Sequence, residues 1–289
     1  YYREAVSDVV DRETFGLVPG SYGTQVDVQT LSQQIQQADY GETIRLPLQY
    51  LPPEVLGQDA YFLDVLGSCE TRHTNDQNRN HNLQLQCDAL NGLVLQPGET
   101  FSMNEVLGER TLERGYKPAP AYSGNRLVNS PGGGVCQVSS TIYYCCLIAD
   151  LEIINRMPHS YVSSYMPMGM DATVSWGGPH FSFKNSTNFP IRIEAKVESG
   201  YVKIQLIGTD EKDYYVKMTY EFIGGSEPED KIIYMTKAEA EAEANAKVAA
   251  SLSDALIDYV RAQAWDGKLP TITGDTPTIV DMNDFTWED

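Results

Sequence analysis

The chain has 289 residues, of which 42% are hydrophobic, and a formal net charge of -19 at pH 7. This composition is typical of a globular protein, and the length allows two domains of ordinary size. The negative charge would repel nucleic acid and anionic membrane surfaces, so we expect neither as a main partner. No stretch approaches the roughly 20 apolar residues of a membrane-spanning helix. We expect any membrane attachment to come through an anchor outside this sequence.

Residues 1–66 carry only short elements. The segment Val28–Ala38 is predicted to form a short helix. The segment Thr43–Tyr50 alternates apolar and polar residues, as a half-buried strand does, and Leu51-Pro52-Pro53 ends it. This part is small for an independent domain, and we interpret it as the remainder of one.

Five cysteines are too few for a disulfide scaffold, and no CxxC pair indicates a structural metal. Cys69 and Cys87 are consistent with a disulfide formed outside the cell and equally with two buried thiols. The adjacent Cys145 and Cys146 are assigned only to packing. We expect no cofactor and no bound metal.

Two helices are predicted in residues 67–208, where glycine turns and polar motifs are dense. The first covers Leu83–Leu90 and ends at Asn91-Gly92, a pair suited to left-handed backbone. The second follows Gly132-Gly133-Gly134, because apolar residues recur from Val138 at spacings of four, three and four. This spacing predicts an amphipathic helix that begins close to Cys136.

Two alternating strands are predicted at Ile191–Val197 and Val202–Leu206, joined as a hairpin by Glu198-Ser199-Gly200. A further strand is predicted at Tyr215–Phe222. Together these elements predict an α+β fold in which the helix that carries the cysteine packs on an antiparallel sheet. Residues 209–268 would hold this last strand and a long amphipathic helix that opens at a capping box, and residues 269–289 an acidic disordered tail.

Cys136 is the candidate nucleophile. A helix N-terminus favours the reactive thiolate through unpaired N–H groups and the helix dipole. The backbone N–H groups of Gly133 and Gly134 are candidates for an oxyanion hole, since glycines let the chain come close to a substrate. Residue chemistry alone fits a buried structural cysteine as well.

A cysteine nucleophile needs a base, and the base needs an orienting partner. His159 and Asp171 each adjoin a strand-like run, so two neighbouring strands would bring them together. The order Cys, His, Asp is that of papain-like and transglutaminase-like enzymes, which we use as an analogy. His180 is the competing base. A zinc site made of Cys136, His159 and His180 has a spacing that matches no established motif.

Arginine is the natural receptor for a substrate carboxylate, because its fork binds both oxygens. Four arginines lie near these motifs, and each is also consistent with a surface charge: Arg79, Arg110, Arg126 and Arg156.

Seven blocks of this sequence, in order, resemble the VanW family. They are Arg79–Leu83, Leu90–Asn104, Val106–Thr111, Gly132–Thr141, Arg156–Ser160, Gly169–Val174 and Phe183–Asn185. The resemblance places a VanW domain at residues 67–208. The region Thr43–Pro53 resembles the end of the peptidoglycan-binding domain that often precedes it, so residues 1–66 would be the remainder of that domain. Pro179-His180 stands where many family members have an aspartate.

The resemblance implies an extracellular protein of a Gram-positive-type cell envelope, associated with glycopeptide resistance. Some VanW-domain proteins have been linked to L,D-transpeptidation, in which a cysteine attacks the third residue of a peptidoglycan tetrapeptide stem. Cys136 matches the cysteine of the family's GGGxCQ motif. The resemblance therefore implies an L,D-transpeptidase with Cys136 as nucleophile, His159 as base and Asp171 as its orienter.

Peptidoglycan stem peptides would be the partners of such an enzyme. Arg156, Arg79, Asn104 and Ser139 are then the candidate substrate-binding residues within the matching blocks. Two alternatives stay open. Hydrolysis of the same acyl-enzyme would make the protein a cysteine peptidase, and a module without catalysis would bind or scaffold the wall.

Overall fold

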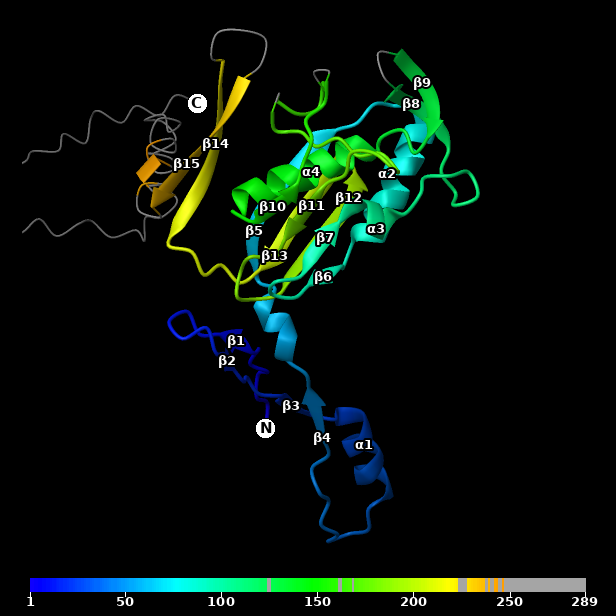
Figure 1. The fold of residues 1–289 in the computed structure, drawn as a ribbon. Helices are drawn as coiled ribbons and strands as arrows, with labels where there is room; N and C mark the ends of the chain where they lie inside the picture. The colour runs from blue at the N-terminus through cyan, green and yellow to red at the C-terminus, as the bar shows by residue number, and fades with distance from the viewer. Residues whose placement is uncertain are drawn as a thin grey trace, which may run out of the picture. The chain divides into compact units, whose positions relative to one another are not determined.

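The computed structural model divides the chain into two compact units, Tyr1–Lys237 and Ala238–Asp289 (Figure 1). The described residues are 1–123, 126–160, 163–167, 169–222 and 228–236, with Glu239, Ala242, Glu243 and Ala246 beyond them. Apart from these last four, which are helical, the predicted long helix and the whole predicted acidic tail lie outside the described residues. No helix in the described ranges is long and apolar enough to cross a membrane.

The N-terminal part contains the predicted helix. It is α1 (Val28–Gln37), and the side chain of Asp27 caps it by accepting a hydrogen bond from the Thr30 N–H at 3.0 Å. The same part holds two short antiparallel pairs: β1 (Val9–Val10) with β2 (Leu17–Val18), and β3 (Gly23–Val26) with β4 (Leu48–Leu51). A short 3-10 helix, η1 (Gly57–Tyr61), follows.

The strand predicted over Thr43–Tyr50 is wrong in its first half. Only β4 is a strand, and Tyr50 is 70% exposed, so the alternating residues do not face a core. Pro47 explains the late start, because it lacks the N–H that an earlier ladder bond needs.

A four-stranded antiparallel sheet forms the base of the following region. Its order is β5 (Asp64–Arg72), β13 (Tyr201–Gly208), β12 (Ile191–Glu198) and β6 (Val94–Leu95). The predicted hairpin is confirmed as β12 and β13. Ser199 and Gly200 both have positive φ, 53° and 86°, which is the backbone that a two-residue hairpin turn requires.

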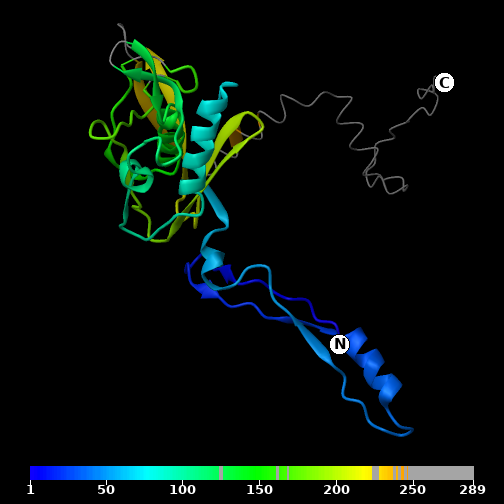
Figure 2. The ribbon, with the colours of Figure 1, turned by 90° about the vertical axis from the view of Figure 1, so that its right-hand side faces the viewer.

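Two helices cover the buried face of this sheet. The helix α2 (Gln77–Leu90) packs on β12, and Figure 2 shows it (cyan) beside the β12–β13 hairpin (yellow-green). It begins before the predicted Leu83, because Asp76 caps it by accepting the Arg79 N–H at 2.7 Å. The helix α4 (Val135–Ile148) packs on β5 and β13 and also contacts α2.

The expectation that α4 is amphipathic is wrong. Of its 14 residues, all but Cys136, Tyr144 and Ile148 are buried. A second sheet covers it, made of β10 (Glu152–Asn155), β11 (Ser182–Lys184) and β7 (Thr100–Ser102). The ring of Phe181 lies 5.8 Å from that of Tyr143, edge to face. The helix is therefore central to the core, and hydrophobic residues surround it.

The strand β5 comes very close to α4 at Gly67. A Cβ atom at this position would lie 2.3 Å from the carbonyl oxygen of Cys145. Two residue pairs further along the sheet, the Cys145 thiol donates to the carbonyl of Ile204 on β13 at 3.4 Å. Glycine is therefore required where the helix meets the sheet.

The remaining elements lie outside these layers. They are α3 (Met103–Leu107), the hairpin of β8 (Pro118–Ser123) and β9 (Arg126–Pro131), and the hairpin of β14 (Tyr214–Phe222) and β15 (Pro228–Thr236). The predicted strand at 215–222 is thus confirmed as β14, with β15 as its partner. The α+β class is confirmed by this mixture of helices and antiparallel sheets.

All five cysteines are free thiols, so the disulfide alternative for Cys69 and Cys87 is wrong. Burial raises the pKa of each of these two thiols to about 12. Cys145 and Cys146 are fully buried in the core, as expected, and burial raises the pKa of both well above the usual value.

Candidate active site

Cys136 is the second residue of α4, as the sequence predicts. Gly134 is the N-cap, with φ at 113°, a conformation open to glycine but not to other residues. At Gly133 a Cβ atom would lie 2.6 Å from the carbonyl oxygen of Ala119 on β8. The glycine turn thus places the partly exposed thiol at the start of a buried helix.

The Cys136 sulfur contacts the backbone of Val174. Sγ lies 3.5 Å from the Val174 nitrogen, which donates to it, and 3.5 Å from the carbonyl oxygen. Ser139 and Ser140 hold the same segment: the Ser139 hydroxyl donates to the Ala172 carbonyl at 2.7 Å, and the Ala172 N–H donates to Ser140 Oγ at 3.0 Å. Ser139 is fully buried, so its observed contact is with this backbone.

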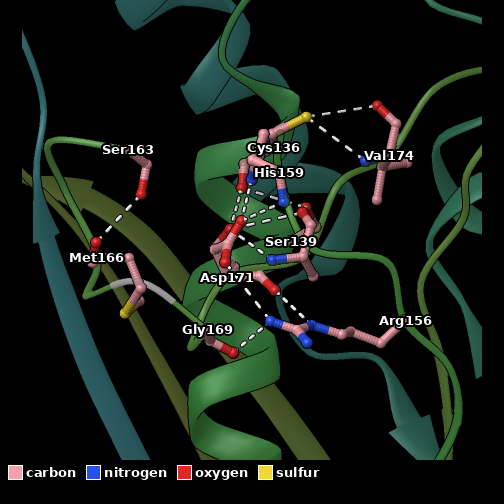
Figure 3. A network of polar contacts seen from close by, with 11 residues as sticks. Cys136, Ser139, Arg156, His159, Ser163, Met166, Gly169, Asp171 and Val174 are labelled. Atoms are coloured by element: carbon pink, nitrogen blue, oxygen red, sulfur yellow. Dashed lines mark hydrogen bonds and ion pairs between the residues drawn. The ribbon is translucent and has the colours of Figure 1, made fainter. Parts of the chain in front are cut away.

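His159 and Asp171 are in direct contact (Figure 3). Oδ2 of Asp171 accepts hydrogen bonds from the His159 backbone N–H, at 2.7 Å, and from its Nδ1. The sequence predicts that the two residues lie on neighbouring strands, and this is wrong. Both lie on irregular segments between β10 and β11. Their proximity therefore comes from the hydrogen bonds of His159 to the Asp171 carboxylate, and from the hydrogen bonds that hold Ala172 on α4.

The imidazole of His159 lies between Asp171 and the sulfur of Cys136. Burial alone would lower the pKa of His159, but hydrogen bonds with Asp171 and Cys136 raise it to about 9. Burial would raise the pKa of Asp171, and the hydrogen bonds from His159 lower it instead. At neutral pH the pair is therefore an imidazolium beside a carboxylate.

Arg156 holds the Asp171 segment in place. Its Nε donates to the Asp171 carbonyl at 2.8 Å, and its guanidinium also bonds to Gly169 and lies 3.5 Å from Asp171 Oδ1. The side chain stacks over the Tyr143 ring, 5.0 Å from its centroid. These contacts give Arg156 a positioning role, and its binding of substrate stays a prediction.

His180 is exposed in the loop before β11, and the described contacts of Cys136 do not include it. The sequence left His159 and His180 as competing bases, and the structure brings only His159 to the sulfur. Within the described ranges no group of three or more His, Cys, Asp or Glu side chains is placed to hold a metal ion.

Unpaired N–H groups lie at the start of α4. The sequence predicts Gly133 and Gly134 as oxyanion donors. The Gly133 N–H already donates to the Ser130 carbonyl, at 3.3 Å. For Gly134 and Cys136, no acceptor of the backbone N–H is found in the part of the chain that the structure describes. These two groups are available to a substrate oxygen.

Three other residues near the sulfur were not among the site residues predicted from the sequence, although Arg110 was one of the four arginines named near the motifs. Gln137 accepts a hydrogen bond from Arg79 at 3.0 Å, and Arg110 donates to Asn104 at 2.8 Å. Asn104 in turn donates to the Ser175 carbonyl at 3.0 Å. The other two predicted substrate-binding residues, Arg79 and Asn104, thus lie in this polar surround.

Tyr165 is the third unassigned residue. Burial raises the pKa of its hydroxyl, and the nearby charge of Cys136 raises it further. It stands in the segment between His159 and Asp171, which has no periodic pattern that would have indicated its position.

The comparisons with known proteins agree with the sequence blocks. The family model described as VanW like protein matches residues 78–207. The uncharacterized protein YoaR of Bacillus subtilis (strain 168) is 37% identical over 215 residues, which are 72% of this chain and 71% of that protein.

The Vancomycin B-type resistance protein VanW of Enterococcus faecalis (strain ATCC 700802 / V583) is 29% identical over 155 residues. These cover 52% of this chain and 55% of that relative. No solved structure matches the chain, so the likeness to papain-like and transglutaminase-like folds stays a prediction. With the family model and YoaR matching the region that carries Cys136, His159 and Asp171, the chain belongs to the VanW family.

Proposed function

We propose that the protein is a peptidoglycan-modifying cysteine acyltransferase that forms L,D cross-links between stem peptides. The observation that carries the proposal is the connected array in which His159 lies between the Cys136 sulfur and the Asp171 carboxylate. A thiol, a base and an oriented partner are the minimum for nucleophilic acyl transfer. The four other cysteines lack such a partner and serve as packing residues.

In the acylation step, the Cys136 sulfur attacks the carbonyl carbon of the third residue of a tetrapeptide stem. Cys136 attacks as the thiolate, since its proton already resides on His159 as the imidazolium, and the carbonyl oxygen takes the negative charge. The unpaired backbone N–H groups of Gly134 and Cys136, at the nucleophile itself and two residues before it, would donate hydrogen bonds to this oxyanion. The bond to the terminal D-alanine then breaks, and the departing amine takes the proton from His159.

In the transfer step, an amine of a neighbouring stem attacks the thioester carbon. His159, neutral after the first step, removes a proton from this amine, the carbon–sulfur bond breaks, and Cys136 returns as the thiolate beside the protonated His159. Asp171 touches no reacting atom. It keeps Nδ1 of His159 bonded, so that Nε2 faces the sulfur and the substrate.

The substrate places the protein at the cell envelope, outside the cytoplasm. Its stem peptides carry amines and carboxylates, which suit a site surrounded by Arg79, Arg110 and polar side chains. The name of the Enterococcus faecalis relative, a vancomycin resistance protein, supports a role in the cell wall. Formation of an L,D cross-link releases the terminal D-alanine of a stem peptide, so the proposed reaction would alter the cell wall itself.

The test is to incubate the protein with disaccharide-tetrapeptides and to analyse the products by mass. Cross-linked dimers with loss of D-alanine are expected from the wild type and not from Cys136→Ala. Cys87→Ala is the matched control, because this buried thiol lies in the core and should leave the products unchanged.

Two other outcomes have a definite meaning. Shortened monomers without dimers would identify water as the acceptor and the protein as a cysteine peptidase. Identical products from wild type and Cys136→Ala, or none from either while both still bind wall fragments, would reject the enzyme and leave a binding module.

A further inference from the structure

Two arginines flank the glycine turn that precedes Cys136. A Cβ atom at Gly132 would lie 2.6 Å from Cβ of Arg110, and one at Gly134 would lie 3.4 Å from Cγ of Arg79. The turn therefore has an arginine stem against each end. Side chains at these glycine positions would displace the arginines, so the glycines make room for them.

Arg110 is buried, at only 9% exposed, and Arg79 is half-buried. Burial lowers the pKa of both, and the Cys136 sulfur acts in the opposite direction on each. This agrees with the contacts at Gly132 and Gly134, which lie four and two residues before Cys136. The nucleophile thus has one buried and one half-buried positive charge beside the turn that precedes it.

Neither arginine has a carboxylate partner within ion-pair distance among the residues described here. Arg79 donates to Gln137 Oε1 at 3.0 Å and to the Pro120 carbonyl at 3.4 Å. Arg110 donates through Nη1 to Asn104 Oδ1 at 2.8 Å and to the Gly108 carbonyl at 2.7 Å. All four acceptors are neutral.

Other arginines of the chain are paired differently. Arg12, Arg156 and Arg192 each lie within ion-pair distance of an aspartate or glutamate. A charge shielded from water is costly unless it is neutralised, so a buried and a half-buried cation without a carboxylate indicate that the missing anion comes from a ligand. Asp76 does not fill the role, because its carboxylate caps α2.

We propose that Arg79 and Arg110 form an anion subsite, which receives a carboxylate of the acyl donor beside the carbonyl that Cys136 attacks. This rests on the proposed function and narrows its substrate class. The carboxylate belongs to the amino acid that leaves, only a few bonds from the attacked carbon. The enzyme therefore acts on peptides with a free C-terminus and releases one amino acid, and it does not cut internal peptide bonds.

The test measures binding separately from chemistry. The Cys136→Ala protein is titrated by calorimetry with a disaccharide-tetrapeptide that ends in D-alanine, and with the same molecule ending in D-alaninamide. The acid should bind about 10- to 100-fold more tightly than the amide, as expected for charge-assisted bonds. Adding Arg79→Gln or Arg110→Gln should remove most of this preference.

Arg192→Gln is the matched control, since Arg192 already has a glutamate partner, and it should keep the full preference. Arg79→Lys and Arg110→Lys keep a charge and an aliphatic stem without the fork, and should retain an intermediate preference. These variants decide the question if a Gln variant fails to fold, as judged by thermal unfolding.

Equal affinity for acid and amide, or no binding of the acid, overturns the subsite, as does a preference that survives in folded Gln or Lys variants without change. Failure of the proposed function looks different. The wild type would release no D-alanine, while the acid preference and its dependence on the two arginines would persist.

Discussion

The carboxylate of Asp171 meets His159 at two points, the backbone N–H and the ring Nδ1, through the same oxygen atom, Oδ2. One acceptor thus fixes both the position of the histidine backbone and the orientation of its ring. A ring held in this way presents its other nitrogen in a constant direction, which a base requires if it is to serve the Cys136 sulfur.

Asp171→Asn should strongly impair this arrangement. The amide carries no charge, so the imidazolium loses its partner, and activity on disaccharide-tetrapeptides should fall by about 100- to 10,000-fold. Release of D-alanine measures the effect. Glu152→Gln, which removes an exposed carboxylate paired with Lys184, should leave the rate unchanged. An Asp171→Asn enzyme of normal rate would exclude Asp171 as the orienter.

Alkylation of the native protein should modify a single thiol. The four other cysteines are largely or fully buried, and burial raises the pKa of each, so their thiolate forms are suppressed. Intact mass after brief treatment with iodoacetamide should show one adduct, located at Cys136 by peptide mapping, and up to five adducts after unfolding. A native adduct on Cys69 would contradict this selectivity.

The stability of the fold should decrease as the pH rises from about 6.5 to 9. The folded-state pKa of His159 is raised from 6.5 to about 9, so protonated His159 stabilises the folded state. This contribution is fully present below the unfolded pKa and is lost as the pH passes the folded one. It is on the order of 1–3 kcal/mol.

Urea unfolding at several pH values measures this loss. In His159→Gln the free energy of unfolding should be nearly independent of pH between about 6.5 and 8, below the range in which the buried cysteines ionise in the unfolded chain. If the wild type and His159→Gln showed parallel profiles, the raised pKa would not come from His159.

Gly67→Ala should destabilise the fold where β5 meets α4. The new Cβ would lie 2.3 Å from the Cys145 carbonyl oxygen, and neither backbone has room to move. We expect a loss of about 1–3 kcal/mol in the free energy of unfolding, measured by urea titration. Gly16→Ala is the control, because its nearest neighbour would be the Thr14 hydroxyl at an ordinary 3.4 Å.

The parts of the fold that follow from local patterns were predicted from the sequence. The period of apolar residues after the triple glycine placed Cys136 at a helix start, and strict alternation identified β12 and β13. By contrast, β5 pairs with β13 across nearly half of the chain, for instance Cys69 with Ile204. No local pattern encodes which distant strand a strand will join.

The site was predicted in the same uneven way. Its nucleophile and its histidine–aspartate contact were anticipated, although neither His159 nor Asp171 itself lies on a strand. Arg110 was named only as one of four arginines near the motifs, and Tyr165 was not assigned, because their closeness to Cys136 depends on tertiary packing. A family resemblance identifies matching positions, but not which of them meet in space.

The two hydrogen bonds between His159 and Asp171 also tie together the two ends of the segment between them. Residues 160–170 start at one of these partners and end at the other, so the loop is tied at its base whatever its length or composition. Tyr165, from within this loop, lies near the charge of Cys136. Substitutions within this segment can therefore change what a substrate meets beside the sulfur, while His159 keeps its place.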